Sequence, residues 1–148
     1  TLFRSYYGCR EYGDFYAKAM SVFGKKYLER WKPDLIVPVP LHPRKKRMRG
    51  FNQAAYLAER LSVLTGILWN EHLVKKIRST RSQKKLNAIQ RRQNLKNAYQ
   101  VTEKIPGFSV LVVDDVYTTG STADAMAMCL LEAGAEKVYF LTICAGRA

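Results

Sequence analysis

The sequence predicts an α/β fold in which a parallel sheet is flanked by helices on both faces. Short runs of aliphatic and β-branched residues alternate with longer segments whose apolar residues have helical spacing. Strand and helix patterns that follow one another in turn are typical of parallel sheets connected by helices. The length of 148 residues and the hydrophobic content of 47% suit one packed domain over residues 1–148.

The first half of the chain contains two predicted helices on either side of a predicted strand. Residues 14–31 have an amphipathic helical pattern that Pro33 ends. A buried strand is predicted at residues 35–39, and its prolines favour a place near the strand end. A second helix begins at Asn52 and ends before Gly66. The apolar residues of the first helix are Phe15, Ala19, Val22, Phe23 and Leu28.

The second half contains three predicted strands and one predicted helix. A strand at residues 73–77 precedes a polar, basic and weakly periodic segment, residues 78–98. The clearest buried strand covers residues 110–113, and the helix after it is closed by Gly134. The last strand covers residues 138–143. Ligands of such sheets bind beyond the carboxyl ends of the strands, so the segments after the strands are the candidate sites.

The net charge of +13 favours an anionic partner, namely nucleic acid, a phosphorylated metabolite or an anionic membrane surface. A merely solvated basic surface is the alternative. No apolar run approaches the roughly 20 residues that span a bilayer, so no membrane insertion is expected. Three cysteines without a C-x-x-C pair argue against a disulfide framework and a zinc site. We expect a reducing, cytoplasmic location.

A segment rich in carboxylates and hydroxyls follows the strand at residues 110–113. Two neighbouring carboxylates repel each other and need a cation or hydroxyl donors nearby. The helix start that follows them offers amide groups to a phosphate, and a glycine there allows close approach. Together these features suit a ribose 5-phosphate; turn residues with a simple helix cap, or a receiver-like acidic pocket, are the alternatives. The predicted ligand-binding residues are Asp114, Asp115, Val116, Tyr117, Thr118, Thr119, Gly120, Ser121 and Thr122.

Residues 112–122 resemble the phosphoribosyl pyrophosphate (PRPP) binding motif of type I phosphoribosyltransferases. In that superfamily the paired acids hold the 2′ and 3′ hydroxyls of the ribose, and the following loop wraps the 5-phosphate. The resemblance implies a type I phosphoribosyltransferase-like fold, PRPP or ribose 5-phosphate as ligand and Mg²⁺ as cofactor. It implies catalytic roles for Asp114, Asp115 and Arg78, with Asp114 and Asp115 holding Mg²⁺ mostly through PRPP and water.

Other segments resemble the ComF family of competence-associated phosphoribosyltransferase homologues. The match is clearest over residues 34–146. Residues 34–42 and 47–53 carry it, and residues 80–83, 86, 91–92, 94–95 and 134–135 continue it. Many members begin with a cysteine-rich zinc-binding segment, which this sequence lacks, so we expect an excised domain or a naturally short member. The family implies a link to DNA uptake, with single-stranded DNA and other competence proteins as candidate partners, and it allows an oligomer.

A basic cluster follows the strand at residues 35–39, and no acidic residue lies between Asp34 and Glu59. By resemblance this is the pyrophosphate loop, where arginine bonds phosphate oxygens bidentately. A solvated basic turn is the alternative, but the position at the carboxyl end of a strand favours function. The predicted pyrophosphate-binding residues are Pro40, Leu41, His42, Arg44 and Arg49.

A second stretch without acidic residues runs from residue 72 to residue 102. Type I phosphoribosyltransferases carry here a mobile loop that closes over PRPP and excludes water. A DNA-binding patch and a solvated helix face are the other open interpretations. The residues assigned to the mobile loop by resemblance are Arg78, Thr80, Arg81, Gln83 and Arg91.

The sequence thus predicts a Mg²⁺-dependent phosphoribosyltransferase that transfers the phosphoribosyl group of PRPP to an unknown acceptor. No acceptor-binding motif is recognisable. The rival hypothesis is a non-catalytic PRPP- or single-stranded-DNA-binding module of the competence machinery, which the charge of +13 supports.

Overall fold

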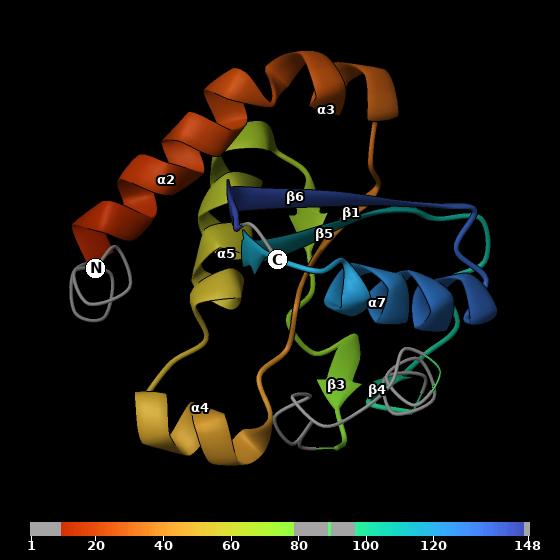
Figure 1. Ribbon diagram of the computed structural model, residues 1–148. Helices are drawn as coiled ribbons and strands as arrows, with labels where there is room; N and C mark the ends of the chain where they lie inside the picture. Colours follow the sequence, from red (N-terminus) through yellow and green to blue (C-terminus); the bar gives the residue numbers. More distant parts are fainter. Residues whose placement is uncertain (1–9, 79–88, 90–96, 147–148) are drawn as a thin grey trace.

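The computed structural model describes residues 10–78, 89 and 97–146 and contains a four-stranded parallel sheet (Figure 1). The strand order is β2-β1-β5-β6, and all three pairings are parallel. Helices cover both faces of the sheet, which confirms the predicted fold class. The strands are β1 (Leu35–Pro38), β2 (Leu68–Trp69), β5 (Ser109–Tyr117) and β6 (Lys137–Ala145).

The two faces of β5 contact different helices, because successive side chains of a strand point to opposite sides. Val110 and Val112 pack in the same core cluster as α7 (Ser121–Glu132). Leu111 and Val113 pack with α2 (Arg10–Phe23), α3 (Lys25–Trp31) and α5 (Gln53–Thr65). All four side chains are fully buried, as expected for a central strand of a parallel sheet.

The predicted strand at residues 73–77 is confirmed as β3 (Val74–Lys76), but it lies outside the parallel sheet. It pairs antiparallel with β4 (Tyr99–Val101), and the pair forms a separate two-stranded sheet that packs on α7. The sequence predicts no strand at β4 or β2, since three and two residues are too short for a periodic pattern. In Figure 1 the pair of β3 and β4 lies below the main sheet, beyond α7.

The single helix predicted over residues 14–31 is wrong in its continuity and in its buried face. Two helices occur, α2 and α3, because the chain bends at Gly24, where a Cβ atom would collide with the carbonyl oxygen of Met20. Phe15, Val22 and Phe23 are 66%, 60% and 84% exposed. The buried face instead consists of Gly13, Ala17, Met20, Gly24 and Leu28.

Small residues explain why that face is buried. The ring of Tyr56, on α5, lies so close to Gly13 that a Cβ atom there would overlap it. Gly13 and Ala17 therefore allow α2 to pack tightly on α5, which large side chains in the same positions would prevent. The predicted stripe of larger apolar residues remains on the outside of α2.

Asn52 fixes both ends of the connection between β1 and α5. Its Oδ1 accepts a hydrogen bond from the amide of Ala54 at 3.1 Å and so caps α5. Its Nδ2 donates to the carbonyl oxygen of Val39 at 3.1 Å, and the side chain is buried. The helix ends at Gly66 in the left-handed conformation, as predicted. The connection contains a further helix, α4 (Pro43–Arg49), which buries no residue.

Candidate functional site

Asp114 and Asp115 lie within β5 and not after its end. The strand continues to Tyr117 because Asp114, Val116 and Tyr117 keep their register with β6. The sequence predicts the end of this strand at residue 113, since the pattern of apolar residues stops there. Both carboxylates are half-buried, and the amide of Asp115 donates to Asp114 Oδ1 at 2.9 Å. The sheet therefore holds the acidic pair in place more firmly than a free loop would.

Burial raises the pKa of Asp114 from 3.8 to about 8, and the neighbouring charge of Asp115 adds to this effect. The positive charge of Lys76 acts in the opposite direction. A negative charge on Asp114 is therefore costly unless a cation or hydroxyl donors come to it. A ligand with hydroxyl groups would supply such donors.

The segment after β5 leads into α7 through Gly120, whose φ is 80°. Gly120 has no side chain to cap the helix, so the first turn offers amide groups to an anion, together with the positive end of the helix dipole. The hydroxyls of Thr119 and Ser121 lie 2.8 Å apart and add polar groups at the same place. Tyr117 lies beside this turn. A Cβ atom added to Gly120 would lie 2.6 Å from the Tyr117 hydroxyl.

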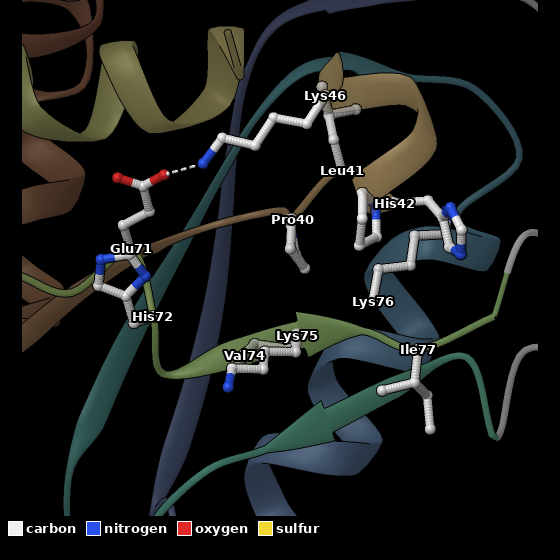
Figure 2. Close-up of a pocket in the computed structure, with 11 residues that line it drawn as sticks. Pro40, Leu41, His42, Lys46, Glu71, His72, Val74, Lys75, Lys76 and Ile77 are labelled. Carbon is white, nitrogen blue, oxygen red and sulfur yellow. Dashed lines mark hydrogen bonds and ion pairs between the residues drawn. The ribbon is translucent and has the colours of Figure 1, made fainter. Parts of the chain in front are cut away.

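A cavity of about 430 Å³ lies between the start of α4 and β3 (Figure 2). The ion pair between Lys46 and Glu71, at 2.9 Å, joins its two sides. Cations outnumber the single lining carboxylate, which suits an anionic ligand. The lining residues are Pro40, Leu41, His42, Pro43, Lys46, Glu71, His72, Val74, Lys75, Lys76 and Ile77.

Three of the five residues predicted to bind pyrophosphate line this cavity, namely Pro40, Leu41 and His42. The Nδ1 atom of His42 accepts a hydrogen bond from the amide of Arg44 at 3.3 Å and so caps α4. Arg44 and Arg49 themselves are exposed on α4 and do not line the cavity. The structure thus brings the three loop residues together at one cavity and leaves the two arginines outside its lining.

The lysines of the cavity were not among the predicted site residues. Lys75 and Lys76 belong to the second stretch without acids, and only their place on β3 distinguishes them from its other cations. Arg78 follows them and is exposed. The other residues assigned to the mobile loop, Thr80, Arg81, Gln83 and Arg91, lie outside the described residues.

Lys76 and Tyr99 link the cavity to the acidic pair. The ammonium group of Lys76 lies 5.4 Å from the centre of the Tyr99 ring and interacts electrostatically with Asp114. Burial lowers the pKa of Lys76, and the charge of Lys45 lowers it further. Burial also raises the pKa of Tyr99 to about 12, although a side-chain hydrogen bond with Thr122 counteracts the shift. Lys76 and Tyr99 therefore lie between the cavity and the segment that carries Asp114 and Thr122.

The described residues contain no group of three or more His, Cys, Asp or Glu side chains that could hold a metal ion. Mg²⁺ commonly binds through one or two carboxylates together with ligand phosphates and water. Asp114 and Asp115 fit that mode, and they do not fit an all-protein metal cage. In the described part of the chain, no helix has the length and apolar character needed to cross a membrane.

Residues 10–148 match the family described as "Phosphoribosyl transferase domain". The chain is 41% identical over 112 residues to the DNA utilization protein YhgH of Escherichia coli K12, covering 76% of the chain and 49% of the relative. It is 39% identical over 109 residues to competence protein F of Haemophilus influenzae, covering 72% and 48%. These relatives confirm the resemblance to ComF proteins, and the chain spans about half their length.

Solved structures confirm the fold. The purine phosphoribosyltransferase of Pyrococcus horikoshii aligns with a TM-score of 0.52 and 20% identity, over 87% of the chain and 69% of that protein. The phosphoribosylpyrophosphate synthetase of Mycobacterium smegmatis aligns with a TM-score of 0.55 and 18% identity, over 86% of the chain and 33% of that protein. At these identities the likeness concerns the fold alone.

Proposed function

Because the chain belongs to the phosphoribosyltransferase domain family, we propose that it binds PRPP with Mg²⁺ and transfers the phosphoribosyl group to an acceptor. The observation that carries this proposal is the position of Lys76. This residue lines the cationic cavity and also interacts with Asp114. A ligand with a ribose at the acids and a pyrophosphate in the cavity would contact both parts at once.

Each part of the site matches one part of PRPP. Asp114 and Asp115 accept hydrogen bonds from the two ribose hydroxyls, which offset the cost of the half-buried charges. The turn at Gly120 and the first amides of α7 receive the 5-phosphate. Lys46, Lys76 and the backbone of the β1–α4 connection receive the pyrophosphate.

In the reaction, an acceptor atom forms a bond to the anomeric carbon while the bond from that carbon to the pyrophosphate oxygen breaks. Pyrophosphate leaves with the electron pair, and the acceptor releases its proton. Lysines fixed in the cavity stabilise the charge on the departing pyrophosphate. Mg²⁺ supplies further charge neutralisation when it is bound. The acidic pair keeps the ribose in place during the displacement.

The test is a calorimetric titration with PRPP and Mg²⁺, performed on the parent chain and on Lys76→Gln and Asp115→Asn. We expect binding by the parent, a higher melting temperature with ligand and weaker binding by both variants. Lys25→Gln, on α3, removes a charge far from the site and serves as the control. Absence of heat and of a thermal shift in the parent would contradict the proposal. Release of pyrophosphate with a panel of amines and nucleobases then tests transfer separately from binding.

A second candidate function is binding of single-stranded DNA, which the exposure of α4 favours. This helix buries no residue and carries several cations, and Met48 beside them is 87% exposed. Such a surface suits a phosphate backbone. The names of the relatives refer to DNA utilization and competence, which agrees with this candidate. Under either function we propose a cytoplasmic location, which suits the free thiols of Cys129 and Cys144.

A further inference from the structure

Gln53, the first residue of α5, has a buried amide group without a hydrogen-bond partner. Its side chain is 3% exposed, and its Nε2 atom has no partner among the residues that the structure describes. The cap of α5 does not need this group, because Asn52 supplies it. An unpaired buried N–H group is costly for folding, and in a native protein it is commonly satisfied by a bound molecule. Gln53 is therefore a candidate donor to a ligand.

The level of Gln53 along the sheet follows from the contacts of its neighbour Asn52. The side chain of Asn52 donates to the carbonyl oxygen of Val39 at 3.1 Å. The amide of Val39 in turn donates to the carbonyl oxygen of Val113 at 2.9 Å, so Val39 lies beside the point where β5 passes from Val113 to Asp114. Gln53 follows Asn52 directly, and α5 therefore begins at the level of the acidic pair.

The packing of α5 on β5 indicates which of the two acids shares a face with Gln53. Leu57 lies one helical turn after Gln53 and belongs to the same core cluster as Val113. Since α5 connects the parallel strands β1 and β2, it runs opposite to them. Four residues back along α5, about 6 Å, thus correspond to two residues forward along β5, from Val113 to Asp115. Alternation places Asp115 on the face that α5 covers and Asp114 on the face of α7.

We propose that Gln53 Nε2 donates a hydrogen bond to the ribose hydroxyl that Asp115 binds. A hydroxyl group both donates and accepts, whereas a carboxylate only accepts. Asp115 takes the proton of the hydroxyl, and the amide of Gln53 approaches its oxygen. A sugar without this hydroxyl leaves Gln53 unpaired, so the two side chains select ribose over a deoxyribose. This inference rests on the proposed function, because it concerns the same ribose.

NMR titrations with ribose 5-phosphate, 2-deoxyribose 5-phosphate and 3-deoxyribose 5-phosphate test the proposal. The parent should bind at least one of the two deoxy sugars more weakly than ribose 5-phosphate. Gln53→Met keeps the length of the side chain and removes the donor. It should bind ribose 5-phosphate about three- to tenfold more weakly, and that deoxy sugar as well as the parent does. The matched control is Gln100→Met, because Gln100 is exposed on β4, and it should leave all three affinities unchanged.

The melting temperature without ligand distinguishes a binding role of Gln53 from a structural one. Gln53→Met removes an unpaired buried N–H group, so its melting temperature should equal or exceed that of the parent. A lower melting temperature, together with an equal loss of affinity for all three sugars, would assign Gln53 to the fold and overturn the proposal.

The titrations also separate this inference from the proposed function. If the parent binds ribose 5-phosphate and Gln53→Met binds it equally well, the role of Gln53 is wrong and the proposed function stands. Equal binding of all three sugars by the parent has the same meaning, since no hydroxyl is then selected. A parent that binds none of the three contradicts the proposed function and this inference together.

Discussion

Lys46 Nζ lies 2.9 Å from Glu71 Oε1, and this ion pair joins α4 to the segment that leads into β3. The two side chains are 51% and 29% exposed. Pairs with this exposure contribute about 0–1 kcal/mol to stability. The ion pair therefore matters for where Lys46 is held, at the edge of the cavity, more than for the stability of the fold.

Lys46→Met should weaken the binding of PRPP or pyrophosphate by about tenfold, because it removes a cation from the cavity. The free energy of unfolding should change by less than about 1 kcal/mol. Titration calorimetry and denaturant unfolding measure the two effects. Lys25→Met is the matched control, since Lys25 also forms an exposed ion pair, with Glu29 at 3.9 Å on α3. Equal loss of affinity in both variants would argue against a role for the cavity.

Asp114→Asn should make the free energy of unfolding less dependent on pH. The pKa of Asp114 is about 8 in the folded chain and 3.8 ordinarily, so the folded chain holds this proton more tightly than the unfolded chain. The stability of the parent should therefore fall as pH rises from about 4 to about 8. The variant has no carboxylate at this position, so its stability should not fall over this pH range. Above about pH 8 its free energy of unfolding should exceed that of the parent by an amount on the order of a few kcal/mol.

Thermal unfolding across this pH range, in the absence of ligand, measures the effect. The control is Glu136→Gln, which removes an exposed carboxylate next to the start of β5, at the other end of this strand from Asp114. Its pH dependence should match that of the parent. The same Asp114→Asn chain should lose affinity for PRPP, so stability and binding should change in opposite directions. A variant that is less stable than the parent above pH 8 would contradict the assigned burial of this charge.

Gly120→Ala should weaken the binding of ribose 5-phosphate strongly, whereas the free energy of unfolding should fall only moderately. Alanine at a φ of 80° costs about 1–2 kcal/mol, and its Cβ atom would also force the Tyr117 hydroxyl to move. Gly66→Ala is the control, because Gly66 has a similar φ of 75° and nothing within 4 Å of an added Cβ atom. Denaturant unfolding should give similar costs for the two variants, while only Gly120→Ala should lose affinity for ribose 5-phosphate.

Removal of charge from α4 should lower the salt dependence of DNA binding. The double variant Lys45→Gln and Arg47→Gln should reduce the slope of log affinity against log salt by about 1.4, if both residues contact phosphates of a single strand. The control removes two exposed lysines from α3, Lys25→Gln and Lys26→Gln, and should keep the parent slope. A fluorescence titration across a salt series, with and without PRPP, measures both. Equal slopes in all three proteins would contradict a role for α4.

The sequence was sufficient to predict the parallel sheet and the apolar part of its central strand, residues 110–113. β5 is apolar on both faces, so its pattern is clear without knowledge of its neighbours. The helix at Asn52 was predictable in the same way, since its cap and its terminal glycine are local features. The face that α2 buries was not, because it depends on the fit of Gly13 to the ring of Tyr56 on another helix.

The cavity could be predicted only in part. Leu41 and His42 follow a strand directly, and their place is therefore set by local order. Lys76 reaches the site from a separate sheet, and of the cations on α4 only Lys46 lines the cavity, whereas Arg44 is exposed outside it. Both outcomes depend on how distant segments pack, which the spacing of charged residues does not encode.

The hydrogen bond from Asn52 to Val39 has a consequence for how this protein can change over time. It closes the base of the excursion at residues 40–51, while β1 and α5 are secured independently by the core. Insertions, deletions or substitutions within residues 40–51 can therefore change which ligand the protein binds, while the free energy of unfolding changes little. In this segment, changes that create a new binding specificity should have little effect on the stability of the fold. This holds as long as Asn52 is retained.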